Sequence, residues 1–132
     1  MSKVMVVEDD RVMVSLLTML LKLDGFEVME PDSVRPIAEQ ALDGRPDVVL
    51  MDVIMARADG ITILDQLRST PDLASLRVIM TSGMDVEEKC RLHGADAFLL
   101  KPYTPDQLIQ TIRAKLEAEG GGFAAPAPLG EP

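Results

Sequence analysis

The sequence predicts an α/β fold: a five-stranded parallel sheet with helices on both faces. Short apolar runs alternate with longer stretches whose apolar residues recur at helical spacing. The short runs are apolar at successive positions, which is typical of strands buried on both faces of a parallel sheet. Because crossovers between such strands are right-handed, the simplest arrangement is a doubly wound sheet.

The first half of the chain supplies three strands and two helices. In order, these expected elements are 4–7, 12–23, 26–29, 37–42 and 48–51. Asp24 and Gly25 end the first helix, and Gly44 and Pro46 end the second, because glycine and proline interrupt helices. The third strand is an uninterrupted apolar run, and Asp52 follows it.

The second half supplies the remaining helices and strands. They are expected at 60–67, 78–80, 86–93, 97–100 and 108–116. Gly94 ends the fourth helix, and Asp59 is expected to cap the third. We expect one domain over residues 1–119 and a flexible Gly/Ala/Pro-rich tail or linker stub over 120–132. A stand-alone protein is favoured over an excised N-terminal domain.

Composition excludes several classes of protein. Thirteen Lys and Arg against twenty-two Asp and Glu give a net charge of −9, which argues against direct contact with nucleic acid. No apolar run approaches the length of a membrane span, and no signal-peptide pattern begins the chain. The single cysteine, Cys90, excludes an internal disulfide framework. A cytoplasmic location is expected.

Polar residues follow the strands at their carboxyl ends. Glu8 and Asp9 follow the first strand, Asp52 the third, Ser82 the fourth and Lys101 the fifth. In an open parallel sheet these ends meet at one edge, and ligands bind there at the topological switch point. In the flavodoxin-like strand order 2-1-3-4-5, the five groups converge on a single site.

The chemistry of this set favours a hard metal ion and phosphoryl transfer. Three carboxylates facing one crevice need a cation or raised pKa values. Oxygen ligands without His or Cys favour Mg²⁺ over Zn²⁺. A carboxylate such as Asp52, beside a metal ion and Lys101, can attack a phosphoryl group and form an aspartyl phosphate.

Five motifs together resemble the response-regulator receiver domain of two-component signal transduction. They are Val6–Asp10, Asp52–Gly60, Ser82–Gly83, Gly94–Asp96 and Lys101–Pro102. The resemblance covers about residues 3–117. It implies that Glu8 and Asp9 hold Mg²⁺, that Asp52 is both metal ligand and phosphoacceptor, and that the main-chain carbonyl of Ile54 completes the protein ligands.

The resemblance also assigns the remaining site residues. Ser82 matches the hydroxyl residue that moves to the phosphoryl group, since its spacing from Asp52 fits better than that of Thr81. Lys101 matches the family lysine, and its bond to Pro102 is expected in cis. Phe98 stands at the position of an aromatic switch residue, although packing alone would make it core filler.

Three departures from the family pattern stand out. Ala56 replaces the usual proline, which removes one φ restraint from the loop after Asp52. The segment from Ser82 to Gly94 is short, so helix four should lose nearly one turn. Phe98 replaces the commoner tyrosine and has no hydroxyl.

The resemblance implies a signalling switch and no independent enzyme activity. A histidine kinase or histidine phosphotransfer protein would supply the phosphoryl group to Asp52 in a Mg²⁺-dependent reaction. The chain would assist this transfer and its own slow dephosphorylation. Helix four, strand five and helix five would carry the change to an output protein or domain, and transient homodimers are expected on the same elements.

Other interpretations remain at this point. Taken singly, Asp9, Asp10, Asp52 and Ser82 could each cap a helix. An aspartyl-phosphate phosphohydrolase would need a second acid where Ile54 stands. A phosphorylation-independent binding module has no reason to keep the acids. A flavin-binding domain would need a Gly/Ser/Thr-rich phosphate loop after the first strand.

Overall fold

Five parallel strands lie side by side in the order β2–β1–β3–β4–β5. The computed structural model describes residues 1–117. Its strands are β1 (Lys3–Val7), β2 (Glu27–Met29), β3 (Val48–Asp52), β4 (Arg77–Ser82) and β5 (Ala97–Leu100). Every pairing between neighbours is parallel, which confirms the predicted sheet and its order.

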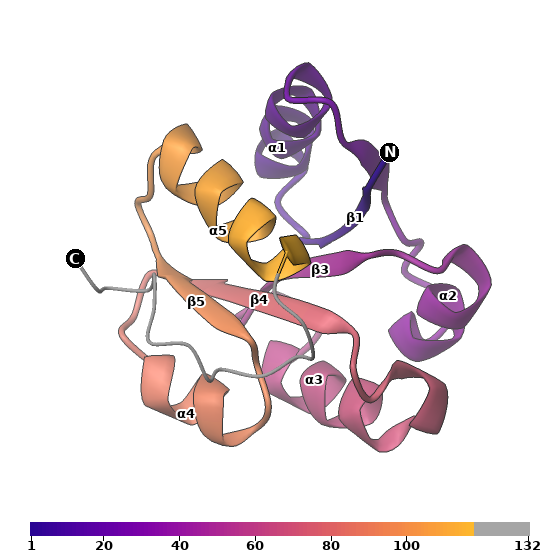
Figure 1. The fold of residues 1–132 in the computed structure, drawn as a ribbon. Coiled ribbons are helices and arrows are strands. Elements are labelled where there is room, and N and C mark those ends of the chain that lie inside the picture. Colours follow the sequence, from indigo (N-terminus) through magenta and orange to yellow (C-terminus); the bar gives the residue numbers. More distant parts are fainter. Residues whose placement is uncertain (118–132) are drawn as a thin grey trace.

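Helices cover both faces of this sheet. They are α1 (Arg11–Leu23), α2 (Ile37–Gly44), α3 (Gly60–Ser69), α4 (Glu87–Leu92) and α5 (Pro105–Glu117), with a short 3-10 helix η1 (Pro71–Leu73). Helices α1 and α5 pack on one face, and α2, α3 and α4 on the other (Figure 1). Within residues 1–117, no helix is long and apolar enough to cross a membrane.

The core lies on both sides of the sheet because alternate residues of a strand point to opposite faces. In β1, Met5 and Val7 pack with α2, α3 and α4, whereas Val4 and Val6 pack with α1 and α5. These side chains are almost completely buried. Burial on two faces is the physical reason that the strands are apolar at successive positions.

The structure differs from the expected elements mainly at their ends. Helix α3 runs on to Ser69, past the expected end at Leu67, and η1 follows it without having been predicted. Helix α4 has six residues, less than two helical turns, in line with the short segment between Ser82 and Gly94. The predicted tail at 120–132 lies outside the described residues.

The helix caps decide one open alternative. Asp10 is the N-cap of α1, and its carboxylate accepts the N–H groups of Val12 and Met13. Asp59 is the N-cap of α3 and accepts the N–H of Ile61, as predicted. Val86 occupies the capping position of α4. Capping therefore does not account for Asp9, Asp52 or Ser82.

Candidate functional site

Strand register brings the polar strand ends to one edge of the sheet. Val7 pairs with Met51 between β1 and β3, and Asp52 pairs with Thr81 between β3 and β4. Ser82 pairs with Leu100 between β4 and β5. The residues that follow β1 and β5 in the sequence therefore lie at the same edge as Asp52 and Ser82.

Lys101 joins two of the acids. Its Nζ lies 3.2 Å from Asp52 Oδ2 and 3.5 Å from Glu8 Oε1. The Glu8 and Asp52 side chains are only 6% and 11% exposed. At this depth Coulomb forces are weakly screened, so one ammonium group between two carboxylates offsets their mutual repulsion.

The environment of Glu8 shifts the pKa of its carboxyl group. Burial raises the pKa of its carboxyl above the ordinary value. The N–H of Asp10, which donates to Glu8 Oε2 at 3.1 Å, and the charge of Lys101 both act in the opposite direction. Burial wins because desolvation disfavours the charged form of a carboxyl group.

Asp9 is held differently. Its carboxylate is exposed, and Oδ2 accepts the main-chain N–H of Ala56 in the loop between β3 and α3. Among residues 1–117, no three acidic, His or Cys side chains form a preassembled metal cluster. We expected Glu8, Asp9 and Asp52 to face one crevice together. Instead, Lys101 contacts both Glu8 and Asp52, and the carboxylate of Asp9 accepts the N–H of Ala56.

The donor set nevertheless fits Mg²⁺. Three carboxylates and the carbonyl of Ile54 offer oxygen ligands from the end of β3 and from the loops after β1 and β3. Mg²⁺ commonly needs only one or two protein carboxylates beside water and phosphate. Glu8 is a buried carboxyl that ionises against a desolvation cost, and a cation at this edge would offset that cost. A preassembled trio is therefore not required.

Gly60 allows α3 to approach the end of β3. A Cβ at Gly60 would lie 2.3 Å from the main-chain oxygen of Asp52 and 2.9 Å from Cα of Val53. The Gly60 N–H donates to Val53 O at 2.8 Å, and the Val53 N–H donates to Thr81 O at 2.9 Å. These backbone contacts place Asp52 relative to both α3 and β4.

Ser82 and Lys101 lie on adjoining strand ends. Ser82 is buried, and its Oγ accepts the N–H of Met84 at 3.0 Å. Its main-chain oxygen accepts the N–H of Lys101 at 2.8 Å. The Lys101–Pro102 bond is cis, as the resemblance implies. The Ser82 hydroxyl acts as an acceptor in its bond with Met84, so its proton is still available for donation to another group.

Phe98 lies inward. It is 4% exposed and belongs to the core cluster that includes Cys90 beneath α4. Its position is that of a core residue, as packing alone suggested. Two exposed apolar side chains near the site are Ile54, which follows β3, and Met84, which follows Ser82.

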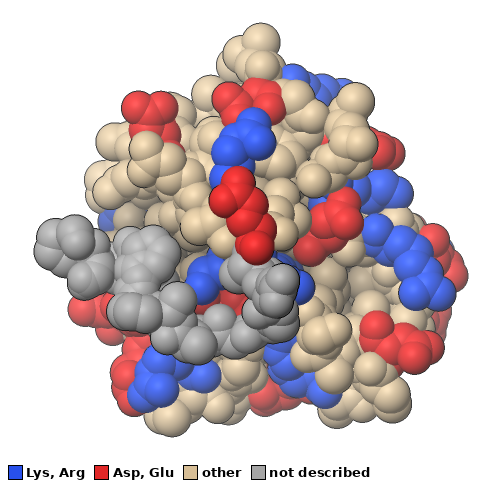
Figure 2. Space-filling model, in the orientation of Figure 1, with Lys and Arg blue, Asp and Glu red and all other residues tan. Residues whose placement is uncertain are grey.

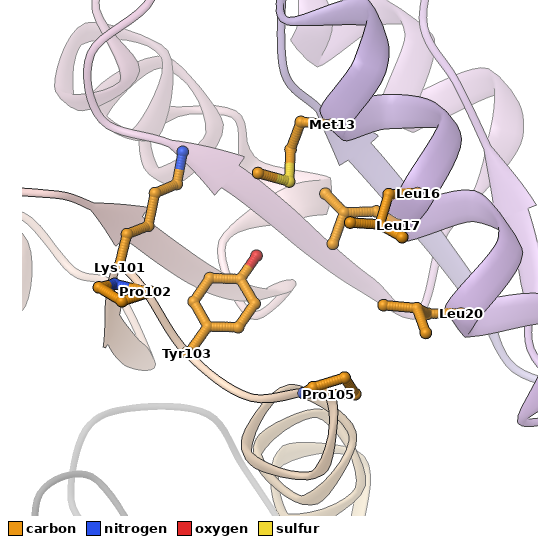
Figure 3. Close-up of a pocket in the computed structure, with 8 residues that line it drawn as sticks. All are labelled: Met13, Leu16, Leu17, Leu20, Lys101, Pro102, Tyr103 and Pro105. Atoms are coloured by element: carbon orange, nitrogen blue, oxygen red, sulfur yellow. The ribbon is translucent and has the colours of Figure 1, made fainter.

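Tyr103 was not anticipated as part of this environment. With Lys101 and Pro102 it faces Met13 and Leu17 of α1 across an apolar groove (Figure 3). Burial, with further contributions from the negative charges of Glu8 and Asp52, raises the pKa of its phenol to about 12. Its place two residues after Lys101 was the available signal in the sequence.

Comparison with known proteins supports the resemblance to receiver domains. Residues 4–113 match the sequence model of the response regulator receiver domain. The transcriptional regulatory protein CpxR of Klebsiella pneumoniae is 37% identical over 120 residues, which make up 88% of this chain and 50% of CpxR. The chain spans about half the length of the curated relatives it matches.

Solved structures share the fold. The chemotaxis protein CheY4 of Vibrio cholerae superposes with a TM-score of 0.78 at 26% identity, covering 86% of this chain and 98% of CheY4. The receiver domain of the sensor histidine kinase PA1611 from Pseudomonas aeruginosa has a TM-score of 0.74 at 19% identity over 89% of this chain and 98% of its own. That structure has a magnesium ion coordinated in its active site cleft.

The strand order, the polar strand ends and the family match all point to one assignment. The sheet order β2–β1–β3–β4–β5 is that of the flavodoxin-like fold, and the family match spans nearly all of the described chain. The chain belongs to the response regulator receiver domain family of two-component signal transduction, whose members are signalling domains.

Proposed function

We propose that the chain is a phosphorylation switch in which Asp52 accepts a phosphoryl group from a phosphohistidine. The observation that carries the proposal is the contact of Lys101 Nζ with both Asp52 and Glu8 at the carboxyl edge of the sheet. A carboxylate oxygen of Asp52 attacks phosphorus, and the phosphorus–nitrogen bond of the donor breaks. The bonding electrons and a proton from solvent go to the histidine.

Glu8, Asp9, Asp52 and the carbonyl of Ile54 are the groups that would hold Mg²⁺. When bound, the ion would supply charge stabilisation for the phosphoryl oxygens. The side chain of Lys101 supplies a second positive charge at the same edge, already directed at Asp52 Oδ2. The magnesium in the PA1611 receiver domain supports this assignment.

Ser82 and Lys101 then change partners. The aspartyl phosphate adds negative charge beside Asp52, so the Ser82 hydroxyl donates to a phosphoryl oxygen and Lys101 leaves Glu8. Because both residues lie at strand ends next to α4 and β5, the change favours a second packing of these elements. Phe98, packed beneath α4, is the side chain that such repacking would move.

The proposed partners are a histidine kinase or histidine phosphotransfer protein and an output protein or domain. A groove on the proposed output face is lined by residues of α4, β5 and α5, including Glu87, Phe98 and Gln110. On the face seen in Figure 2, basic side chains lie scattered among acidic ones and form no continuous basic patch. This pattern supports a protein partner over direct contact with nucleic acid.

The deciding experiment is phosphorylation by an acyl phosphate, with and without Mg²⁺, of wild type and Asp52→Asn. Intact-mass spectrometry of wild type should show the addition of one phosphoryl group that requires Mg²⁺. Asp52→Asn keeps the size of the side chain and should show none. A mass gain that is indifferent to Mg²⁺, or that persists in Asp52→Asn, would refute the proposal.

We expect slow self-dephosphorylation. Ile54 and Met84 are 58% and 61% exposed, and their apolar side chains should hinder the in-line approach of water to the aspartyl phosphate. Replacing them in Ile54→Asn/Met84→Glu should speed the decay on the order of tenfold, which corresponds to about 1.4 kcal/mol in the barrier. The measurement is loss of phosphate from Asp52 over time, and equal decay rates would contradict the idea.

Glu8→Gln should stabilise the protein at neutral pH in buffer without Mg²⁺. Burial raises the pKa of Glu8 in the folded state, so its stabilising contribution is present below the ordinary glutamate pKa and is lost as pH rises through the raised value. Glutamine keeps the uncharged form at every pH. Urea unfolding followed by circular dichroism, from below the ordinary glutamate pKa to neutral pH, should show a free energy of unfolding that changes less with pH in the variant than in wild type.

Two controls complete this test. Glu39→Gln removes an exposed carboxylate of α2 and should change stability little. Addition of Mg²⁺ should stabilise wild type more than Glu8→Gln, because the variant lacks a ligand. If Glu8→Gln is instead less stable than wild type at neutral pH, the contact with Lys101 outweighs the cost of burying Glu8.

A further inference from the structure

One hydrogen bond joins the two loops that carry the proposed metal ligands. Asp9 lies in the loop between β1 and α1, and Ile54 lies in the loop between β3 and α3. The main-chain N–H of Ala56 donates to Asp9 Oδ2 at 2.5 Å, across 47 positions of sequence. The β3–α3 loop therefore contacts a proposed ligand carboxylate through its backbone.

The backbone that follows Asp9 is held by bonds of Asp10. Asp10 caps α1 through the N–H groups of Val12 and Met13, and its own N–H donates to Glu8 Oε2. The side chain of Asp9 itself is exposed. The bond from Ala56 restrains this side chain, because it holds one carboxylate oxygen near the β3–α3 loop.

This donor depends on the residue type at position 56. The receiver family usually has proline there, and proline has no main-chain N–H. The side chain of Ala56 is exposed, so it contributes little packing. What alanine adds at this position is the donor itself.

We propose that the main-chain N–H of Ala56 is a positioning group for Mg²⁺ binding, and that it orients the carboxylate of Asp9 toward the ion. The inference rests on the proposed function. An ionised carboxylate has about four lone-pair sites, so Asp9 can accept from Ala56 through Oδ2 and still ligate through Oδ1. Outer-shell bonds of this kind orient metal ligands and commonly matter roughly 10- to 100-fold in affinity.

The test compares Mg²⁺ affinity by isothermal titration calorimetry in the 132-residue chain. Ala56→Pro removes the donor, and an amide-to-ester replacement at the same bond removes it without adding a ring. Both should weaken Mg²⁺ binding about tenfold, the lower end of the outer-shell range. Ala56→Ser keeps the N–H on the same exposed position and should bind Mg²⁺ as wild type does.

A second measurement does not depend on the fold of the position 56 variants. The amide proton of Ala56 should resonate downfield in the NMR spectrum of wild type and should move upfield in Asp9→Asn, a weaker acceptor. At saturating Mg²⁺ the wild-type signal should stay downfield, because ligation through Oδ1 leaves the bond in place. An upfield move on adding Mg²⁺ would mean that ion and N–H compete, and would overturn the inference.

The outcomes separate the inference from the proposed function. Wild type that binds no Mg²⁺ would refute the proposed function itself. Wild type that binds Mg²⁺, with equal or tighter binding by folded Ala56→Pro and by the ester, would overturn only the role of Ala56. Weaker binding by both, with Ala56→Ser unchanged, would establish it.

Discussion

Arg68→Met should lower the free energy of unfolding by about 3–5 kcal/mol, the range for removing one partner of a buried ion pair. Arg68 Nη2 lies 2.9 Å from Asp96 Oδ2, and the Asp96 side chain is only 2% exposed. The guanidinium also donates to the carbonyl oxygens of Gly94 and Leu76. One side chain at the end of α3 thus connects the segments that lead into β4 and β5.

The loss is large because the remaining carboxylate stays buried. Asp96 also accepts the N–H of Val78 at 2.7 Å, so it cannot turn to solvent without leaving that donor unpaired. Arg68→Met/Asp96→Asn should recover part of the loss, since asparagine keeps an acceptor for Val78 and carries no charge. Equilibrium unfolding in urea, followed by circular dichroism because the chain has no tryptophan, measures both variants.

Arg11→Met is the matched control. Arg11 pairs with Glu30, but the two side chains are 72% and 41% exposed. Exposed pairs contribute about 0–1 kcal/mol, so this variant should unfold almost as wild type does. If Arg68→Met lowers the free energy of unfolding no more than Arg11→Met does, the buried ion pair does not hold together the segments that lead into β4 and β5.

Gly60→Ala should destabilise the protein by about 1–3 kcal/mol, as overpacking in a close-packed site does. The new Cβ would lie 2.3 Å from the main-chain oxygen of Asp52, and neither that strand nor α3 can give way independently. Since Gly60 is the first residue of α3, alanine would otherwise stabilise the helix by up to about 1 kcal/mol. The sign of the change therefore tests the contact.

The substitution should also disturb Asp52. Helix α3 must move away from β3, and Asp52 ends that strand, so phosphorylation by acyl phosphate should slow as well. Gly83→Ala is the control, because a Cβ at Gly83 meets nothing within 4 Å. Gly83 also adjoins a site residue, so loss of stability in both variants would show a general intolerance of this edge.

The fold was predictable because its determinants are local. Each strand carries its apolar residues in one run and each helix carries them at helical spacing, so burial on two faces is visible without any long-range information. The carboxyl ends of parallel strands then meet by topology alone. That is why Glu8, Asp52, Ser82 and Lys101 could be assigned to one edge before their contacts were known.

The pairing of groups within the site was not predictable in the same way. Position along a strand tells which edge a residue reaches, but the rotamer and the partner of each side chain depend on atoms far away in sequence. Lys101 lies between Glu8 and Asp52, and Asp9 accepts the N–H of Ala56. Both contacts join residues that are far apart in the sequence, so no local sequence pattern predicts them.

The sequence by itself determined the class of fold, the order of elements, the edge at which the acids gather and the resemblance to receiver domains. Only the tertiary structure decided that Asp10 and not Asp9 caps α1, that Phe98 lies inward and that Arg68 compensates Asp96. The physical reason is range. Hydrophobic periodicity acts between neighbours in the chain, whereas charge compensation and hydrogen bonding act between neighbours in space.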